Sequence, residues 1–169
     1  MRVRLGDVRD WPFIYALGKL GIPHSISPWR KQPMTETMKY RESILRGFWI
    51  WIQQSGCIVF IAEASVEAEE SGLETGKPQP VGYLVLQPSS REELTGVLQG
   101  WVMDLAVLPE SRGKGAGTAL MKAAEDHCIK QKIPYLGLAV SSHNVRALYL
   151  YEQLGFAEER KLMVKQLEL

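Results

Sequence analysis

One glycine-rich run, residues 112–117, has residue types and a spacing that could do chemistry. Gly113, Gly115 and Gly117 carry no side chain to shield their amides, so a ligand can approach this backbone closely. The run is followed by Thr118–Glu125, where apolar residues recur at helical spacing. The first N–H groups of a helix have no partner and lie at the positive end of its dipole. The run therefore predicts an anion site suited to a phosphate.

Two common phosphate-binding loops do not match this run. The mononucleotide loop, G-x-x-x-x-G-K-[ST], needs a glycine where the chain has Leu108, and Lys114 is followed by another glycine. The dinucleotide pattern, G-x-G-x-x-G, fails because its third glycine falls on Thr118 or Leu120, depending on where the count begins. Both of these nucleotide loops are therefore excluded here.

A third pattern, [RQ]-x-x-G-x-[GA], matches at Arg112, Gly115 and Gly117 with no departure. The match follows Trp101–Leu108, an apolar segment with the length and β-branched content of a strand. Pro109 ends that segment because it cannot continue a strand ladder. This pattern is the pyrophosphate loop of the GCN5-related N-acetyltransferase (GNAT) superfamily. The chain resembles that family here and in the preceding sequence LAVLPE.

A second stretch resembles the same family over the signature N-x-x-A-x-x-x-Y-x-x-x-G-F. The chain matches its five fixed positions with Asn144, Ala147, Tyr151, Gly155 and Phe156. The resemblance implies that Tyr151 protonates the departing coenzyme A thiolate. It also implies that Asn144 contacts the pantetheine arm or the thiol region.

Two tyrosines compete for the functional position in this second stretch. At about 100° per residue, Tyr151 falls on the same helix face as Ala147 and Leu154, whereas Tyr149 falls on the opposite side. The projection predicts that Tyr151 faces the sheet and the cofactor and that Tyr149 faces solvent. The alternative is that Tyr151 is a core aromatic residue whose hydroxyl is bonded elsewhere.

The reaction that the resemblance implies is transfer of an acetyl group from acetyl-CoA to an amine. A lysine-type amine has a pKa of about 10.4, so some group must accept its proton before attack. The leaving thiol has an ordinary pKa of about 8.5 and benefits from a proton donor, for which Tyr151 is the expected general acid. The resemblance assigns the acetyl-CoA contacts to Leu105, Ala106, Val107, Arg112, Gly113, Lys114, Gly115, Ala116, Gly117, Thr118, Asn144 and Tyr151.

The residues leave the general base open between several candidates. Glu63 lies in an apolar segment and can equally be a paired structural carboxylate. Asp104 lies in the central apolar segment and, by strand alternation, points away from the face that its two neighbours share. His24 and His143 lie in expected loops, and a chain of waters to solvent is an equal alternative. No His and Cys cluster has metal-ligand spacing, so we expect no metal.

Residues that contact the acceptor are expected near the first two helices. In this family the loop between them shapes acceptor specificity, and here that loop includes Ser25–Arg30. Arg30 and Lys31 indicate an acidic group on the acceptor. Trp49 and Trp51 could line an acceptor pocket, although aromatic residues at the end of an apolar helix are more often core residues.

The composition indicates one soluble domain over residues 1–169, with 46% hydrophobic and 23% charged residues. A formal charge of +1 favours neither nucleic acid nor an anionic membrane as a partner. Cys57 and Cys128 make no disulfide framework. The first residues lack a signal peptide, and Phe48–Ile52 is far short of the ~20 residues of a membrane span. We therefore expect a cytoplasmic monomer or homodimer.

The elements that must position these residues follow an α+β order. We expect a GNAT-like mixed sheet flanked by helices, β-α-α-β-β-β-α-β-α-β-β. Glu67–Pro80 is expected to be a mobile hairpin loop, and Gln87–Gly96 a polar turn. The expected strands are Arg2–Leu5, Cys57–Ala64, Val81–Leu86, Trp101–Leu108, a buried Pro134–Val140, and two closing strands after Phe156, the last at Leu162–Leu167. The expected helices run from Asp10 to Gly21, from Thr35 to Ser55, onward from Thr118, and from Asn144 to Leu154, the last capped by Ser141 and Ser142.

The leading interpretation is an acetyl-CoA-dependent N-acetyltransferase that acts on a primary amine of a small molecule or of a protein lysine. One alternative is acetylation of a protein N-terminus, which uses the same loop and tyrosine. A different class of function, a catalytically silent coenzyme A sensor, also stays open because the general base is not assigned.

Overall fold

The computed structural model describes residues 1–65 and 77–168, in which five strands and four α-helices form. The strands are β1 (Arg2–Leu5), β2 (Ile58–Ala64), β3 (Gln79–Arg91), β4 (Leu98–Val107) and β5 (Tyr135–Leu138). The helices are α1 (Trp11–Ser25), α2 (Met34–Ser55), α3 (Ala116–Lys130) and α4 (Val145–Gln153), with short 3₁₀ turns at Val8–Asp10 and Pro109–Ser111. Of the predicted loop Glu67–Pro80, residues 67–76 lie outside the described residues. Its last residues, Gln79 and Pro80, already belong to β3.

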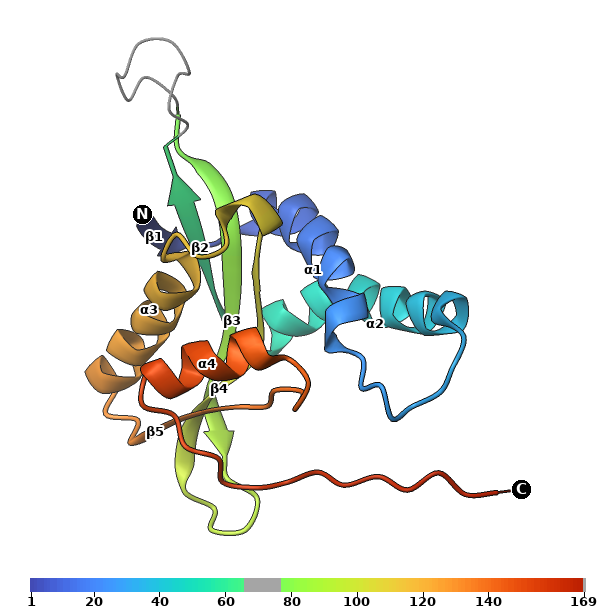
Figure 1. The fold of residues 1–169 in the computed structure, drawn as a ribbon. Coiled ribbons are helices and arrows are strands. Elements are labelled where there is room, and N and C mark those ends of the chain that lie inside the picture. Colours follow the sequence, from blue (N-terminus) through green and yellow to red (C-terminus); the bar gives the residue numbers. More distant parts are fainter. Residues whose placement is uncertain (66–76, 169) are drawn as a thin grey trace.

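The five strands form one mixed sheet in the order β1-β2-β3-β4-β5. The first four pair antiparallel, and β5 pairs parallel with β4. In Figure 1, α1 and α2 lie on one side of the sheet and α3 on the other. The predicted α+β class, with helices flanking a mixed sheet, is confirmed.

Two apolar clusters hold the helices on the sheet. The cluster under α1 and α2 contains Ile14, Leu17, Ile52, Val59, Ile61, Tyr83 and Val85. The cluster under α3 contains Phe60, Ala62, Val81, Leu84, Leu86, Val102, Ala116, Leu120, Met121, Ala124, Cys128 and Ile133, and Tyr151 and Leu154 of α4 pack against it. Tyr83 stands out in the first cluster because a fully buried hydroxyl needs a partner.

A bulge in β4 and the short length of β5 shape the middle of the sheet. Val85 of β3 pairs with Asp104, but the next residue pairs with Val102, so Met103 is an extra residue in β4. The side chain of Asp104 therefore lies on the α1 and α2 side, opposite Leu105, as alternation predicted. β5 pairs with β4 only over Gln99–Val102, so within the described chain the β5-side edge of β4 has no strand beside it beyond that point.

Two element boundaries differ from the prediction. α1 does not end at Gly21 but continues to Ser25, because Ile22 is buried in the next turn, and His24 therefore lies in a helix and not in a loop. β3 extends to Arg91 through the segment expected to be a turn, because its last residues pair with the start of β4.

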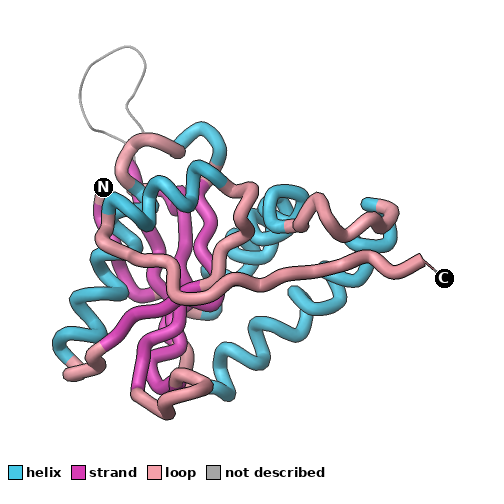
Figure 2. The backbone as a smooth tube through the Cα atoms, turned by 60° about the horizontal axis from the view of Figure 1, so that its bottom comes forward, coloured by secondary structure: helices cyan, strands magenta, loops and turns pink. Residues whose placement is uncertain are grey.

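The expected closing strands are the main error in the predicted element order. Residues 156–168 form no strand in the described structure, and Leu162 and Met163 are 96% and 88% exposed. Figure 2 shows this segment leaving the sheet and passing α1 and α2 as a loop. Apolar residues favour a strand only where a partner backbone can accept and donate hydrogen bonds. β5 is also less buried than expected, with Tyr135 64% exposed.

Candidate active site

The glycine run forms a tight loop between β4 and α3. Gly113 and Gly115 have φ angles of 78° and 85°, in the left-handed region that residues with side chains rarely adopt. A Cβ atom at Gly115 would meet no other heavy atom within 4 Å, so the space beside the loop is open. The backbone therefore requires these two glycines, and their missing side chains leave the loop accessible.

The loop presents a row of backbone N–H groups to a ligand. The first hydrogen bond of α3 runs from the Ala119 N–H to the Gly115 carbonyl oxygen, at 2.9 Å. Within the described residues, the N–H groups of 113–118 donate to no backbone carbonyl, and no side chain caps the helix at Gly115. α3 has 15 residues, so its dipole adds positive potential at the same place. The run predicted to bind a phosphate thus has the donors that a pyrophosphate needs.

The side chain of Arg112 holds the loop onto the sheet. Its Nε donates to the Val107 carbonyl oxygen at 3.1 Å, at the end of β4. One part of the guanidinium thus shapes the loop, and the remaining N–H groups are left to contact a phosphate.

Arg146 is a site residue that the sequence interpretation missed. A Cβ atom built at Gly113 would lie 3.5 Å from a terminal guanidinium nitrogen of Arg146, which reaches the loop from the first turn of α4. In the described structure this side chain forms no ion pair or hydrogen bond with the protein. The sequence does show a positively charged residue two positions after Asn144. That spacing alone, however, does not show that α4 packs beside the glycine loop.

The unpaired edge of β4 lies next to this loop. Leu105, Ala106 and Val107, which the resemblance assigned to the pantetheine arm, are half-buried and pair with β3 on their other side. Because β5 ends at Leu138, the backbone groups of β4 that point away from β3 have no strand partner in the described chain. A ligand with amide groups can take the place of the missing strand.

The two tyrosines of α4 have the environments that the helical projection predicted. Tyr149 is 65% exposed, whereas Tyr151 packs against the core and lies 5.8 Å from Phe156 between ring centroids. Burial, together with the charge of Asp104, raises the pKa of the Tyr151 hydroxyl. Tyr151 is therefore protonated at neutral pH, as a proton donor must be.

Asn144 caps α4, which corrects the prediction that Ser141 and Ser142 do so. Its Oδ1 accepts from the Ala147 N–H at 3.3 Å, so its side-chain amide nitrogen is the group left for a ligand. Ser141 instead donates from its hydroxyl to the Ser25 carbonyl oxygen at 2.9 Å, which joins the end of α1 to the loop before α4.

Tyr83 of β3 and Asp104 of β4 form a part-buried hydrogen-bonded pair. The Tyr83 hydroxyl donates to Asp104 Oδ2 at 2.6 Å. The backbone of α1 closes over the pair, since a Cβ atom at Gly18 would lie 2.9 Å from the Tyr83 hydroxyl. Burial raises the pKa of the Asp104 carboxyl, and the bond from Tyr83 partly offsets that effect. The sequence interpretation named Asp104 as a candidate base. It missed Tyr83, because the sequence alone does not distinguish this tyrosine from other residues of a strand.

The family model described as "Acetyltransferase (GNAT) family" matches residues 24–156 of this chain. The chain belongs to the GNAT acetyltransferase family. Members of this family take acetyl-CoA as the acyl donor, and the free amides of the glycine loop and the open edge of β4 fit that cosubstrate.

Curated relatives of this GNAT chain match it over part of their length. An uncharacterized N-acetyltransferase of Bacillus subtilis, YhfO, is 43% identical over 56 residues, which are 33% of this chain and 38% of the relative. Streptothricin acetyltransferase of Streptomyces lavendulae is 38% identical over 56 residues, which are 33% of this chain and 30% of the relative. The chain thus aligns with well under half the length of these relatives.

Solved structures share the whole GNAT fold with this chain. The ribosomal-protein-alanine N-acetyltransferase of Brucella melitensis biovar Abortus 2308 superposes with a TM-score of 0.61 at 20% identity. The match covers 99% of this chain and all of that one. At this identity the likeness supports the fold of the GNAT chain.

The other candidate bases do not join the site of the GNAT chain. Glu63 accepts from Arg4 Nε at 2.6 Å at the β1–β2 pair, so it is a paired structural carboxylate. His24 lies in the last turn of α1, and His143 is exposed in a turn. Trp49 stacks on Trp11 with ring centroids 5.3 Å apart, in agreement with a core role.

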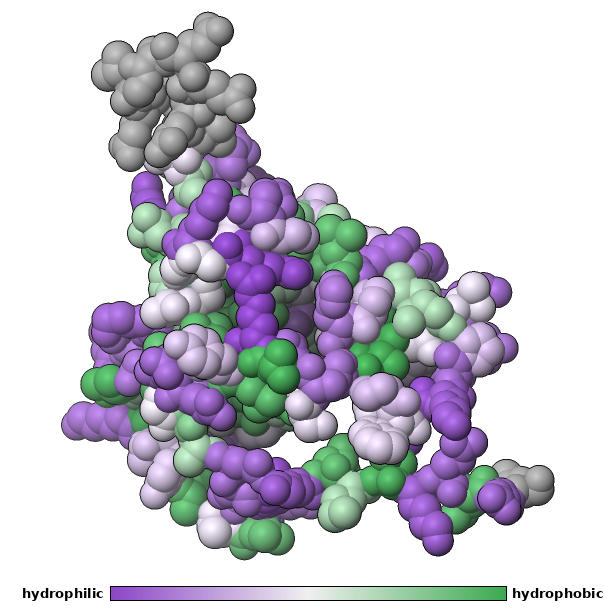
Figure 3. Space-filling model, viewed as in Figure 1, coloured by the Kyte–Doolittle hydropathy of each residue, from purple (hydrophilic) through white to green (hydrophobic). Residues whose placement is uncertain are grey.

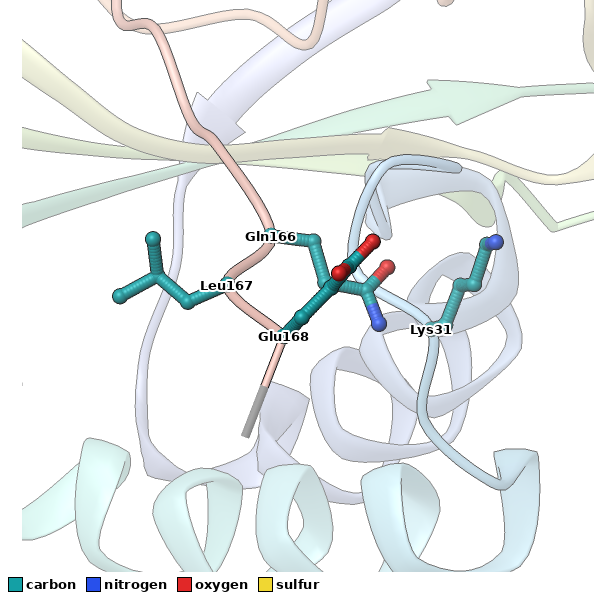
Figure 4. A pocket seen from close by; sticks show the side chains of 4 residues that line it. All are labelled: Lys31, Gln166, Leu167 and Glu168. Carbon is teal, nitrogen blue, oxygen red and sulfur yellow. The ribbon is translucent and has the colours of Figure 1, made fainter.

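A separate hollow of about 580 Å³ lies away from this site, between the end of the chain and the connection from α1 to α2. Figure 4 shows its lining residues: Lys31, Gln166, Leu167 and Glu168. In Figure 3 an opening separates the C-terminal segment from the body of the GNAT domain. Lys31, one of the two cations predicted to face the acceptor, lines this hollow, whereas none of the residues predicted to contact acetyl-CoA does.

Two kinds of feature are absent from the described residues. None of their helices is both long and apolar enough to cross a membrane. Over the same part of the GNAT chain, three or more His, Cys, Asp or Glu side chains never come together in a group that could hold a metal ion.

Proposed function

We propose that this chain is an acetyl-CoA-dependent N-acetyltransferase that acetylates a primary amine by direct attack, with Tyr151 as general acid. The observation that carries the proposal is the position of Tyr151. It is half-buried on α4 and packs against the same core cluster as Leu105 and Val107 of β4, whose edge has no strand partner at this point in the described chain.

Each part of the site has a separate task in this proposal. The amides of residues 113–118 hold the pyrophosphate, and Arg146 adds a positive charge beside Gly113. The unpaired backbone of β4 orients the pantetheine arm, and a backbone N–H there stabilises the charge that develops on the acetyl oxygen. Bound acetyl-CoA supplies an acetyl group that is activated as a thioester.

Tyr151 acts on the leaving group. Its hydroxyl gives a proton to the sulfur as the carbon–sulfur bond breaks, which avoids expelling a bare thiolate. A raised pKa keeps the hydroxyl protonated at neutral pH, so the donor is present in each catalytic cycle. Holding the amine and the acetyl carbon in one orientation contributes to the rate as well.

The acceptor is an amine-bearing small molecule or a protein. Streptothricin acetyltransferase and the ribosomal-protein-alanine N-acetyltransferase carry names that point to one acceptor of each kind. The direct test is release of coenzyme A thiol, with mass spectrometry of the product. The panel would be streptothricin, an aminoglycoside, a lysine peptide and a peptide with an N-terminal alanine.

The panel also distinguishes the alternatives. We expect acetyl-CoA-dependent thiol release and a mass increase of one acetyl group on a side-chain or small-molecule amine. Modification of the alanine peptide alone would support an N-terminal acetyltransferase. Binding of acetyl-CoA without release from any member would support a coenzyme A sensor and contradict the proposal.

The glycine loop offers a matched binding test. Gly115→Glu places a carboxylate in the anion site and strains the left-handed backbone, so acetyl-CoA binding should be lost. Gly47→Glu is the control, because a Cβ atom at this exposed glycine of α2 also meets no other heavy atom within 4 Å. Unchanged affinity of a folded Gly115→Glu protein in titration calorimetry would rule out this loop as the pyrophosphate site.

A further inference from the structure

α2 carries two apolar stripes, and only one of them is buried. The inner stripe includes Leu45 and Ile52, which the rest of the fold covers. The other stripe, here called the outer seam, consists of Tyr40, Ile44, Gly47 and Trp51. Its three side chains are 65%, 45% and 37% exposed. A row of large apolar side chains left open to solvent indicates a surface that another molecule covers.

The outer seam has the spacing of a contact between two helices. Its members are four, three and four positions apart, so they fall within about 60° of one another around the helix. This alternation keeps one helix aligned with a second helix along its length. Figure 1 shows α2 at the outer side of the fold, where a second molecule can reach it.

The outer seam is complementary to a second copy of itself in the antiparallel direction. One register places Tyr40 opposite the partner's Trp51 and, at the same time, Ile44 opposite the partner's Gly47. A Cβ atom at Gly47 would meet no other heavy atom within 4 Å, so the isoleucine of the other copy has space there. Aromatic rings thus meet aromatic rings, and a large side chain meets a missing one, as close packing requires.

The charges of α2 are compatible with the same register. Its exposed cations each come level with an uncharged residue of the partner helix, so like charges do not face each other. These cations are Lys39, Arg41 and Arg46, level with positions 52, 50 and 45 of the partner. In a parallel pair Gly47 would instead face the partner's Gly47, which leaves a gap between two layers of larger side chains.

Phe48 prepares the outer seam for a partner. It stacks on Trp51 with ring centroids 5.8 Å apart and the ring planes at 9°. The stack restricts the indole before any partner binds, which lowers the entropy lost on association. The sequence left Trp51 open between an acceptor pocket and the core, and the structure has it on the exposed side of α2.

The size of the outer seam predicts a reversible contact. A helix of 22 residues is about 33 Å long and about 10–12 Å wide, which gives a footprint of roughly 350 Å² on each copy. Stable complexes bury about 1,200–2,000 Å² in total. A pair of α2 helices falls below that range, so its dissociation constant should be micromolar.

We propose that the outer seam of α2 is a self-association surface, where two copies of this chain pair antiparallel. The two-fold axis crosses α2 between Leu45 and Arg46, so each contact occurs twice. This surface lies on the opposite side of the sheet from α3 (Figure 1). The inference therefore goes beyond the proposed acetylation and does not depend on it.

The first test is sedimentation velocity of the full chain from about 5 to 300 µM. We expect a shift from monomer to dimer over this range. Ile44→Lys places a charge in the outer seam and should weaken the dimer at least about tenfold. Gln53→Lys puts the same side chain at an exposed position of α2 outside the seam, and should leave the dimer unchanged. A wild type that stays monomeric throughout, or equal dimerisation of the two variants, would overturn the inference.

The second test separates the contact from the stability of the fold. Gly47→Gln favours the helix, so the urea midpoint of the monomer should rise. The same side chain fills the space that the partner's Ile44 needs, so self-association should weaken while acetyl-CoA affinity in calorimetry stays unchanged. Undiminished self-association of Gly47→Gln would contradict the packing of Ile44 on Gly47.

The third test reports the direction of the pair by cross-linking under mild oxidation. Tyr40→Cys and Trp51→Cys are made as separate proteins and mixed, with the wild type as the background for Cys57 and Cys128. Only the mixture should form a dimer linked by a disulfide, because equal positions of an antiparallel pair lie about 16 Å apart along the axis. Cross-linking of each variant alone would show a parallel pair. That result, or a mixture that cross-links no better than the wild type, would overturn the inference whether or not the chain acetylates amines.

Discussion

Asp10 is buried and Asp104 is half-buried; side chains from the sheet hold both carboxylates, but their partners carry different charges. Asp10 accepts two bonds from the guanidinium of Arg4, at 2.7 and 2.8 Å, and Arg4 also bonds Glu63. Asp104 accepts its bond from the neutral hydroxyl of Tyr83. Arg4 lowers the pKa of Asp10, whereas burial raises the pKa of Asp104.

The difference shows that one of these two carboxylates is neutralised by a cation within the described structure and the other is not. A carboxylate with a full cation beside it is already neutralised and has little tendency to take a proton from a substrate. A carboxylate fixed by a neutral donor keeps its charge available at the cost of stability. The three predictions that follow test this contrast, in order of expected effect.

The largest effect should come from Arg4→Met, which leaves Asp10 buried without a cation. We expect the free energy of unfolding to fall by about 3 kcal/mol, at the low end for a buried pair because Arg4 is partly exposed. Urea denaturation at pH 7 measures this change in the free energy of unfolding. Arg9→Met, which breaks the exposed pair with Asp7, is the control and should change little. Equal effects of the two variants would contradict a structural role for the Arg4 group.

The second substitution should increase the free energy of unfolding. Asp104→Asn should raise the free energy of unfolding at pH 7 by about 0.5–2 kcal/mol, because it removes a partly buried charge that has no cation beside it in the described structure. The folded pKa of Asp104 lies above its unfolded value of about 3.9, so wild-type stability falls as pH rises between the two. The advantage of the variant should therefore shrink toward pH 4. A variant less stable than the wild type at pH 7 would contradict the contrast between Asp10 and Asp104.

The smallest expected effect is on KM for acetyl-CoA, and it concerns an arginine without a protein partner in the described structure, Arg146. Arg146 has no protein partner among the described residues and lies beside Gly113, so it should be free to bind a phosphate. Arg146→Ala should raise KM for acetyl-CoA by about 5–10-fold, less at high salt, with kcat unchanged. Lys122→Ala, on the exposed face of α3, is the control. No change in KM at low salt would exclude Arg146 from the site.

Local patterns predicted the parts of the fold that depend on local interactions. The glycine loop, the start of α3 and the opposite orientations of Tyr149 and Tyr151 follow from backbone requirements and a helical period, and the structure has them. The end of α1 was wrong because burial of Ile22 outweighs the tendency of Gly21 to end a helix.

Features that depend on distant partners could not be found this way. The closing strands were predicted from apolar content, but a strand needs a neighbouring edge, and none pairs with residues 156–168 in the described structure. Tyr83 and Asp104 are 21 positions apart, and the bulge at Met103 changes which residues meet across β3 and β4. Likewise, Arg146 reaches the loop only because α4 packs beside α3.

The central claim, amine acetylation with Tyr151 as general acid, is tested most directly by comparing Tyr151→Phe with Tyr149→Phe. Both variants lose one hydroxyl from α4 and keep the ring. The measurement is steady-state turnover over a range of pH with an accepted amine. We predict that Tyr151→Phe lowers turnover by about 10²–10⁴, less at high pH, while acetyl-CoA affinity and the Tyr149→Phe protein stay near the wild type. Small, equal effects of the two substitutions would contradict the account.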